Sequence, residues 1–167
     1  EEGFALSGAD AALLDSRQID HAVLPDRAFG ELGLIVSDMD STLITIECVD
    51  EIEAGVGLKD RVAEITERSM RGELDFEQSL RSRVALLAGL DEQVLAEVYE
   101  NVLRLSPGAE FLLDECKAHG VKFMLVSGGF TFFTDRLQTR LGLDYTHANL
   151  LDTDDGRLTG RLNGRLI

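Results

Sequence analysis

Two short apolar runs constrain the fold of this chain more than any other feature. They are residues 32–37, L-G-L-I-V-S, and residues 121–126, V-K-F-M-L-V. Each run is partly β-branched and continuous rather than alternating, which is typical of a strand buried on both faces of a parallel sheet. Helical patterns lie between and after the two runs. Strands that alternate with helices indicate an α/β fold.

Residues 48–105 show helical periodicity and no strand. Asp75 and Gln78 have the spacing of a capping box, so a helix is expected to begin there. One side of that helix would carry Phe76, Leu80, Arg83, Val84 and Leu87. We therefore predict three parts: a helical cap at 48–105, a core formed by 31–47 and 106–167, and a lead-in at 1–30.

Two more helices and a hairpin are expected in the second half of the chain. Pro107 suits the first turn of a helix that Gly120 would end, and residues 131–141 read as a helix stopped by Gly142. Residues 145–151 and 157–162 flank T-D-D-G. This pattern predicts a β-hairpin that turns at Asp155-Gly156.

The first apolar run places two carboxylates, Asp38 and Asp40, at the end of its strand. Open α/β sheets bind ligands beyond the carboxyl ends of their strands. Residues two apart in an extended chain point the same way, so these like charges need a compensating cation, and Mg²⁺ suits an oxygen-rich site. An EF-hand does not fit, because Leu43 stands where that loop requires Gly. From these residues alone, two aspartates that merely cap a turn remain an alternative.

The second apolar run ends in S-G-G-F, residues 127–130. Gly128 and Gly129 would let the backbone approach an anion closely, Ser127 adds a hydroxyl donor, and the next helix would aim its amides at the same place. An ordinary strand-to-helix turn is the simpler interpretation of this motif taken alone. Carboxylates on one loop and an anion cradle on the next together predict a phosphoryl-transfer site.

Composition narrows the classes of partner. The chain has 31 acidic and 16 basic residues and a net charge of −15, which argues against nucleic acid but leaves room for a small phosphorylated ligand beside a metal ion. No membrane span or secretory segment is expected from the apolar runs. Cys48 and Cys116 lack metal-ligand spacing, so we expect packing cysteines in a reduced, cytoplasmic protein without zinc.

The two motifs together resemble the haloacid dehalogenase superfamily, and within it the phosphoserine phosphatases. This resemblance implies a Rossmann-like, three-layer α/β core with an inserted helical cap. The resemblance extends over residues 31–167 through E-C-V-D-E-I, M-R-G-E-L-D-F-E-Q-S-L-R-S-R-V, A-N-L and D-G-R-L-T-G. It implies that Asp38 is the nucleophile that forms an aspartyl-phosphate and that Asp40 is the general acid and base. Mg²⁺ would be held by the Asp38 carboxylate and the Asp40 backbone carbonyl.

The resemblance also implies how O-phospho-L-serine is recognised in the last step of serine biosynthesis. Ser127, Gly128 and Gly129 would bind phosphate. Glu47 would meet the ammonium and Arg83 the carboxylate, and Met70 and Phe76 would form an apolar lid. Without the resemblance, Arg83 reads as a solvated helix residue and the two lid residues read as ordinary core.

Two parts of the family's pattern have no counterpart here. One is a lysine that ties the nucleophile to the phosphate, since Lys59, Lys117 and Lys122 all lie elsewhere, and the other is a G-D-G-x-N-D loop. We therefore expect a truncated phosphoserine phosphatase that lacks the C-terminal strands of the core and is weakly active or inactive. Its first strand would have an unpaired edge, which predicts a homodimer through that edge or poor solubility.

Three functions remain open at this point. The chain encodes a Mg²⁺-dependent phosphatase for phosphoserine, or a phosphatase for another small phosphate ester, although Glu47 with Arg83 favours an amino-acid substrate. The third alternative is an inactive fragment that binds metal or phosphate weakly, or that a second polypeptide completes. The sequence does not assign a role to residues 1–30.

Overall fold

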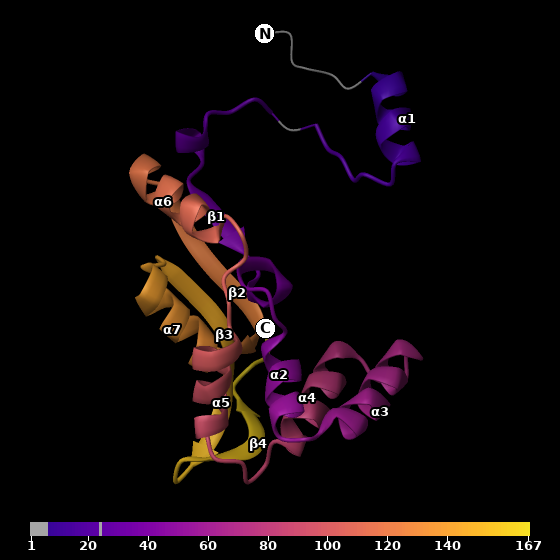
Figure 1. Cartoon of the computed structure of the whole chain (residues 1–167), viewed down its shortest axis with the longest axis vertical. Helices are drawn as coiled ribbons and strands as arrows, with labels where there is room; N and C mark the ends of the chain where they lie inside the picture. Colours follow the sequence, from indigo (N-terminus) through magenta and orange to yellow (C-terminus); the bar gives the residue numbers. More distant parts are fainter. Residues whose placement is uncertain (1–6, 24) are drawn as a thin grey trace.

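A four-stranded sheet forms the centre of the protein. The computed structural model describes residues 7–23 and 25–167. Strands β1 (Leu34–Ser37), β2 (Lys122–Phe130) and β3 (Tyr145–Asp154) run parallel, and β4 (Arg157–Asn163) is antiparallel to β3, in the order β1-β2-β3-β4 (Figure 1). The α/β class with a mainly parallel sheet is confirmed.

The core lies on one face of this sheet. Phe123 and Leu125 of β2 are buried in a cluster with Leu113 of α6 (Ala109–His119) and Leu137 of α7 (Thr131–Leu141). The opposite face carries Leu34 and Val36 of β1, which are 46% and 57% exposed. The prediction that residues 32–37 are buried on both faces is therefore wrong for β1, because the core receives only the alternate side chains of this strand.

Five of the helical elements between β1 and β2 form the segment that was expected to be a cap, residues 48–105. They are α2 (Cys48–Gly55), α3 (Lys59–Met70), α4 (Phe76–Leu86), α5 (Gln93–Glu97) and the short π-helix η3 (Val98–Val102). The capping box of α4 is confirmed, since Asp75 accepts from the Gln78 amide and the Gln78 side chain accepts from the Asp75 amide. Helices α3 and α4 project to one side of the molecule (Figure 1). Their treatment as a separate cap domain stays a prediction.

The hairpin of β3 and β4 ties the helical segment to the sheet. Asp155 and Gly156 both have positive φ, 47° and 73°, as a type I′ turn requires, so the predicted hairpin is confirmed. Leu158 of β4 exchanges two backbone hydrogen bonds with the segment after α4, at 2.8 Å from Gly89 and 2.9 Å to Leu90. The helices therefore rest on the hairpin as well as on the sheet.

The described N-terminal residues contact this body through Phe29, which packs edge-on against His119 of α6. Helix α1 (Gly8–Ser16) has no buried residue and lies apart from the rest in Figure 1, and a short 3-10 turn, η1 (Phe29–Glu31), precedes β1. The predicted lead-in at 1–30 falls partly outside the described residues. In the described part of the chain, no helix combines the length and the apolarity that a membrane crossing requires.

Candidate active site

The two aspartates lie where β1 ends and a short π-helix, η2 (Met39–Leu43), begins. The backbone turns sharply there, because Ser41 adopts a left-handed φ of 52°. Asp38 caps the turn, and its Oδ1 accepts a 2.6 Å hydrogen bond from the Met39 amide. Met39 is fully buried, so it anchors the loop in the core while its neighbours face outward.

Asp40 lies deeper than Asp38 and joins three elements. Its Oδ1 accepts from the Cys48 amide at the start of α2 (2.9 Å), and its Oδ2 accepts from the Ser127 hydroxyl (3.4 Å). Burial raises the pKa of Asp40, and the nearby charges of Glu47 and Asp38 add to this, while the hydrogen bonds from Cys48 oppose it. A carboxylate with a raised pKa is suited to proton transfer.

The S-G-G motif lies at the end of β2, where the register between β2 and β3 shifts. Ser127 is buried, and its Oγ accepts from the Gly129 amide at 2.9 Å. A Cβ on Gly129 would approach Asp40 Oδ2 to 3.1 Å, and a Cβ on Gly128 would approach Phe76 to 3.1 Å. Glycine is thus required by close approach rather than by backbone angles.

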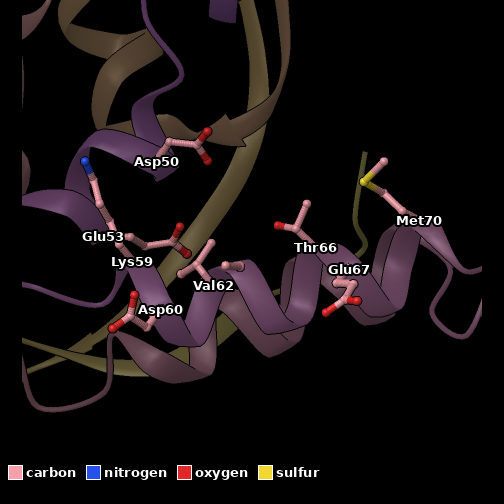
Figure 2. A pocket seen from close by; sticks show the side chains of 9 residues that line it. Asp50, Glu53, Lys59, Asp60, Val62, Thr66, Glu67 and Met70 are labelled. Carbon is pink, nitrogen blue, oxygen red and sulfur yellow. The ribbon is translucent and has the colours of Figure 1, made fainter.

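One cavity of about 360 Å³ collects most of the expected site residues. It is lined by Asp38, Asp40, Glu47, Val49, Asp50, Phe76, Leu80, Arg83, Gly128 and Gly129. Ser127 lies just beneath it, as its contact with Asp40 shows. Met70 is the exception: it is 85% exposed at the end of α3 and lines a different hollow, drawn in Figure 2. Nine residues were expected at the site from the sequence. The structure brings eight of them together at this cavity and leaves only Met70 apart.

Arg83 reaches the cavity already paired with carboxylates. Its Nε and Nη2 donate to Glu53 at 3.0 Å and 2.6 Å, and Nη2 also donates to Asp50. Glu53 is only 1% exposed. Sequence reasoning missed this residue, although an acidic side chain next to Ile52 on the buried stripe of α2 was a signal that it has a buried partner.

A second residue that the sequence reasoning left without a role is Asn149 of β3. It is buried, and its amide donates to the Gly128 carbonyl at 2.8 Å. This hydrogen bond holds the glycine loop in position from the neighbouring strand. The signal was a polar residue between two apolar neighbours, Ala148 and Leu150, in a predicted strand.

The cavity offers oxygen atoms that could hold a cation. Asp38 offers a carboxylate at the cavity and Asp40 a backbone carbonyl, but the described residues contain no cluster of three or more His, Cys, Asp or Glu able to hold a metal. Mg²⁺ commonly uses one or two carboxylates and takes its other ligands from water and phosphate. Four acidic side chains line the cavity with one arginine. This arrangement fits a divalent cation held partly by its ligand.

Comparison with known proteins decides the family. The model of the haloacid dehalogenase-like hydrolases matches residues 35–167 of this sequence. The chain belongs to the haloacid dehalogenase-like hydrolases. The match confirms the resemblance to this superfamily that was drawn from the motifs.

Individual relatives of this hydrolase are named phosphoserine phosphatases. The protein from Polaromonas sp. (strain JS666) is 57% identical over 139 residues, which cover 83% of this chain and 59% of the relative. Among solved structures, a probable phosphoserine phosphatase from Vibrio cholerae, in unliganded form, has a TM-score of 0.81 at 44% identity and covers 98% of this chain and 51% of its own.

A further structure shows a phospho-aspartyl intermediate analogue of phosphoserine phosphatase. It has a TM-score of 0.71 at 41% identity and covers 80% of this chain and 63% of that chain. The present chain thus spans between half and two thirds of the length of these relatives.

Proposed function

We propose that this protein is a phosphoserine phosphatase, which hydrolyses O-phospho-L-serine to L-serine and phosphate with Mg²⁺. The observation that carries the proposal is the single cavity in which paired carboxylates, a glycine loop and an arginine meet. The names of the relatives support the substrate. In this role the protein would act in the cytoplasm, in the last step of serine biosynthesis.

The first half of the reaction uses both aspartates. A carboxylate oxygen of Asp38 attacks phosphorus, the bond from phosphorus to the serine oxygen breaks, and protonated Asp40 gives its proton to that oxygen. Asp40 is placed for this by the Cys48 amide and the Ser127 hydroxyl. A solved structure of a phospho-aspartyl analogue in a relative supports the covalent intermediate.

The second half releases phosphate. Water attacks the aspartyl-phosphate and gives its proton to Asp40, and the bond between phosphorus and Asp38 breaks. Ser127 and the amide of Gly128 would hold phosphate oxygens during both halves, and Gly129 would leave room for the phosphate beside them. Mg²⁺, held by the Asp38 carboxylate and the Asp40 carbonyl, would supply positive charge for the phosphate when bound.

Recognition of the amino acid would come from the helical segment. Glu47, fixed by a 2.6 Å hydrogen bond from Ser41, would meet the ammonium, and Arg83 would meet the carboxylate. Phe76 already lies over Gly128 and would exclude water. Met70 would join the lid only if the end of α3 moves toward the cavity.

Turnover by this chain alone is expected to be low. Among the described residues no lysine or arginine contacts Asp38. Lys117 donates to Leu141, Lys122 donates to Asp144, and Lys59 lines the separate hollow beside α3. The negative charge of a nucleophile facing phosphate is therefore poorly balanced. We also propose that two copies associate through the open edge of β1.

The test is phosphate release from O-phospho-L-serine by the 167-residue chain, measured with Mg²⁺ and with a chelator. We expect slow phosphate release that depends on Mg²⁺. Asp38→Asn should reduce it to the rate measured in buffer without protein. Asp114→Asn, an exposed position on α6, is the matched control and should leave the rate unchanged. Release that survives Asp38→Asn would exclude Asp38 as the nucleophile.

A further inference from the structure

The guanidinium of Arg83 is held from its buried side by Glu53. Both oxygens of Glu53 take part, at 3.0 Å and 3.2 Å from Nε, and Oε2 lies 2.6 Å from Nη2. This is a two-point fork, the geometry in which a carboxylate fixes the plane of a guanidinium. Because Glu53 is 1% exposed, its charge would have no other partner if this contact opened.

Asp50 contacts the same guanidinium in a different way. Asp50 is not part of the two-point contact and accepts a hydrogen bond only from Nη2. Its side chain is 59% exposed. Asp50 also lines both the cavity of the aspartates and the hollow between α2 and α3. Figure 2 shows Asp50 and Glu53 on α2 at one side of this hollow, with α3 along the other.

Separating Glu53 from Arg83 and separating Asp50 from Arg83 therefore differ in free energy. Separating Glu53 from Arg83 would strand a buried charge, which is strongly unfavourable. Separating Asp50 returns a carboxylate to water, and exposed ion pairs contribute little. A third carboxylate brought to Arg83 would crowd three negative charges around one cation. The carboxylate that leaves is then Asp50.

We propose that Glu53 is a positioning residue that fixes Arg83, and that Asp50 occupies the place on Arg83 which the ligand's carboxylate takes over on binding. This rests on the proposed function, because it assigns the carboxylate of an amino-acid phosphate to Arg83. It goes further in naming two acidic residues of α2 with opposite effects on the same contact. Glu53 supports recognition of the carboxylate, and Asp50 competes with it.

The experiment compares two ligands that differ only in the carboxylate. O-phospho-L-serine and phosphoethanolamine are titrated by calorimetry, with Mg²⁺, into the unmodified chain and into Asp50→Asn and Glu53→Gln. We expect Asp50→Asn to tighten phosphoserine by roughly two- to fivefold, the size of an exposed ion pair. Glu53→Gln should weaken phosphoserine by about tenfold or more, as for a lost hydrogen bond to a charged group. Neither should change phosphoethanolamine.

A second measurement needs no ligand. The Nε–H signal of Arg83 in NMR should be protected from solvent exchange in the unmodified chain and in Asp50→Asn, and it should lose protection in Glu53→Gln. Equal effects of the two variants on the preference for phosphoserine, or protection kept in Glu53→Gln, would overturn the proposal while leaving the proposed function intact. If neither phosphate ligand binds the unmodified chain, the proposed function is wrong. The proposal that the ligand's carboxylate replaces Asp50 on Arg83 is then wrong as well.

Discussion

At Asp40 the proposed role in proton transfer conflicts with the stability of the fold. The carboxylate of Asp40 is half-buried, and burial raises its pKa more than the hydrogen bonds from Cys48 lower it. A group whose pKa is raised in the folded state favours folding only while it is protonated. At neutral pH the charged form therefore costs folding free energy.

We predict that Asp40→Asn raises the melting temperature by a few degrees at pH 7.5 in the presence of a chelator. Asparagine keeps an oxygen for the Cys48 amide and removes the buried charge. The stabilising contribution of protonated Asp40 is complete below the unfolded pKa, about 3.9, and is lost as pH rises through the folded pKa. The gain from Asp40→Asn should thus shrink as pH falls toward 4, which thermal unfolding followed by circular dichroism can measure. A lower melting temperature at pH 7.5 would contradict this account.

The residues of the site differ in how visible they are in the sequence. Asp38, Asp40, Gly128 and Gly129 follow directly on strands, so their position is set by local chain geometry and could be predicted. Glu53 could not, because its role depends on a helix 30 residues further along that brings Arg83 against it. Pairing across that distance leaves no local pattern beyond an acidic residue on a buried stripe.

At the level of elements, the contact between β4 and the segment after α4 is unusually close. Gly160 has a φ of 79°, and a Cβ placed there would lie 2.8 Å from the Cβ of Ala88 and 3.2 Å from the carbonyl oxygen of Ala85. Both the backbone angle and the space exclude a side chain. The hairpin can support the helical segment only because this residue is glycine.

We predict that Gly160→Ala lowers the free energy of unfolding by about 2–4 kcal/mol, the sum of a strained φ and an overpacked contact. Gly156→Ala is the matched control: its φ is 73°, but nothing lies within 4 Å of a Cβ there. It should cost only about 1 kcal/mol, for the backbone angle alone. Urea unfolding of both variants separates the cost of the backbone angle from the cost of the contact with Ala88. If both variants lose the same free energy of unfolding, the contact with Ala88 relaxes at no cost.

The start of the sheet is held by Asp144, between α7 and β3. Its carboxylate accepts from Lys122 Nζ at 2.7 Å and from the Phe123 amide at 2.9 Å. The hydrogen bond from Lys122, followed by that from Phe123, lowers the pKa of Asp144. The stability that this contact contributes is therefore present above the unfolded pKa of Asp144 and is lost as pH falls through the folded one.

We predict that Asp144→Asn lowers the melting temperature at pH 7. The difference from the unmodified chain should begin to shrink as pH falls below the unfolded pKa, about 3.9, and should disappear below the lower folded pKa. Asp154→Asn, at the other end of β3, should have no such effect, because Asp154 makes no side-chain hydrogen bond with the described residues. Thermal unfolding across this pH range tests the sign. A difference that grows toward low pH would be the wrong sign for this contact.

Elements were predictable where one local pattern decides them. The hairpin at Asp155-Gly156 and the capping box at Asp75 are confirmed because short-range geometry fixes both. The burial of β1 was mispredicted, because the same apolar run is compatible with a strand covered on one face or on two. Which faces are covered depends on packing partners that lie far away in the sequence.

For the whole molecule, the decisive feature is that β1 is the outer strand of the described sheet. Its second edge has no strand partner among residues 7–23 and 25–167, and Leu34 and Val36 are exposed beside it. An open apolar edge favours pairing with another chain. A net charge of −15 on each copy opposes association, and salt screens that repulsion.

For the 167-residue polypeptide by itself we therefore predict a homodimer in which the β1 edges of two copies pair. The dimer fraction should rise with salt concentration. Val36→Lys should shift the protein to monomer, because lysine on an edge strand disfavours pairing and Val36 lies outside the core. Val23→Lys, at a similarly exposed valine before the sheet, is the control and should leave the dimer intact. Light scattering measures the molar mass of the unmodified chain and of both variants at low and high salt, and so tests this prediction. A monodisperse monomer at high salt, or a dimer that tolerates Val36→Lys, would mean that the edge of β1 is closed in some other way.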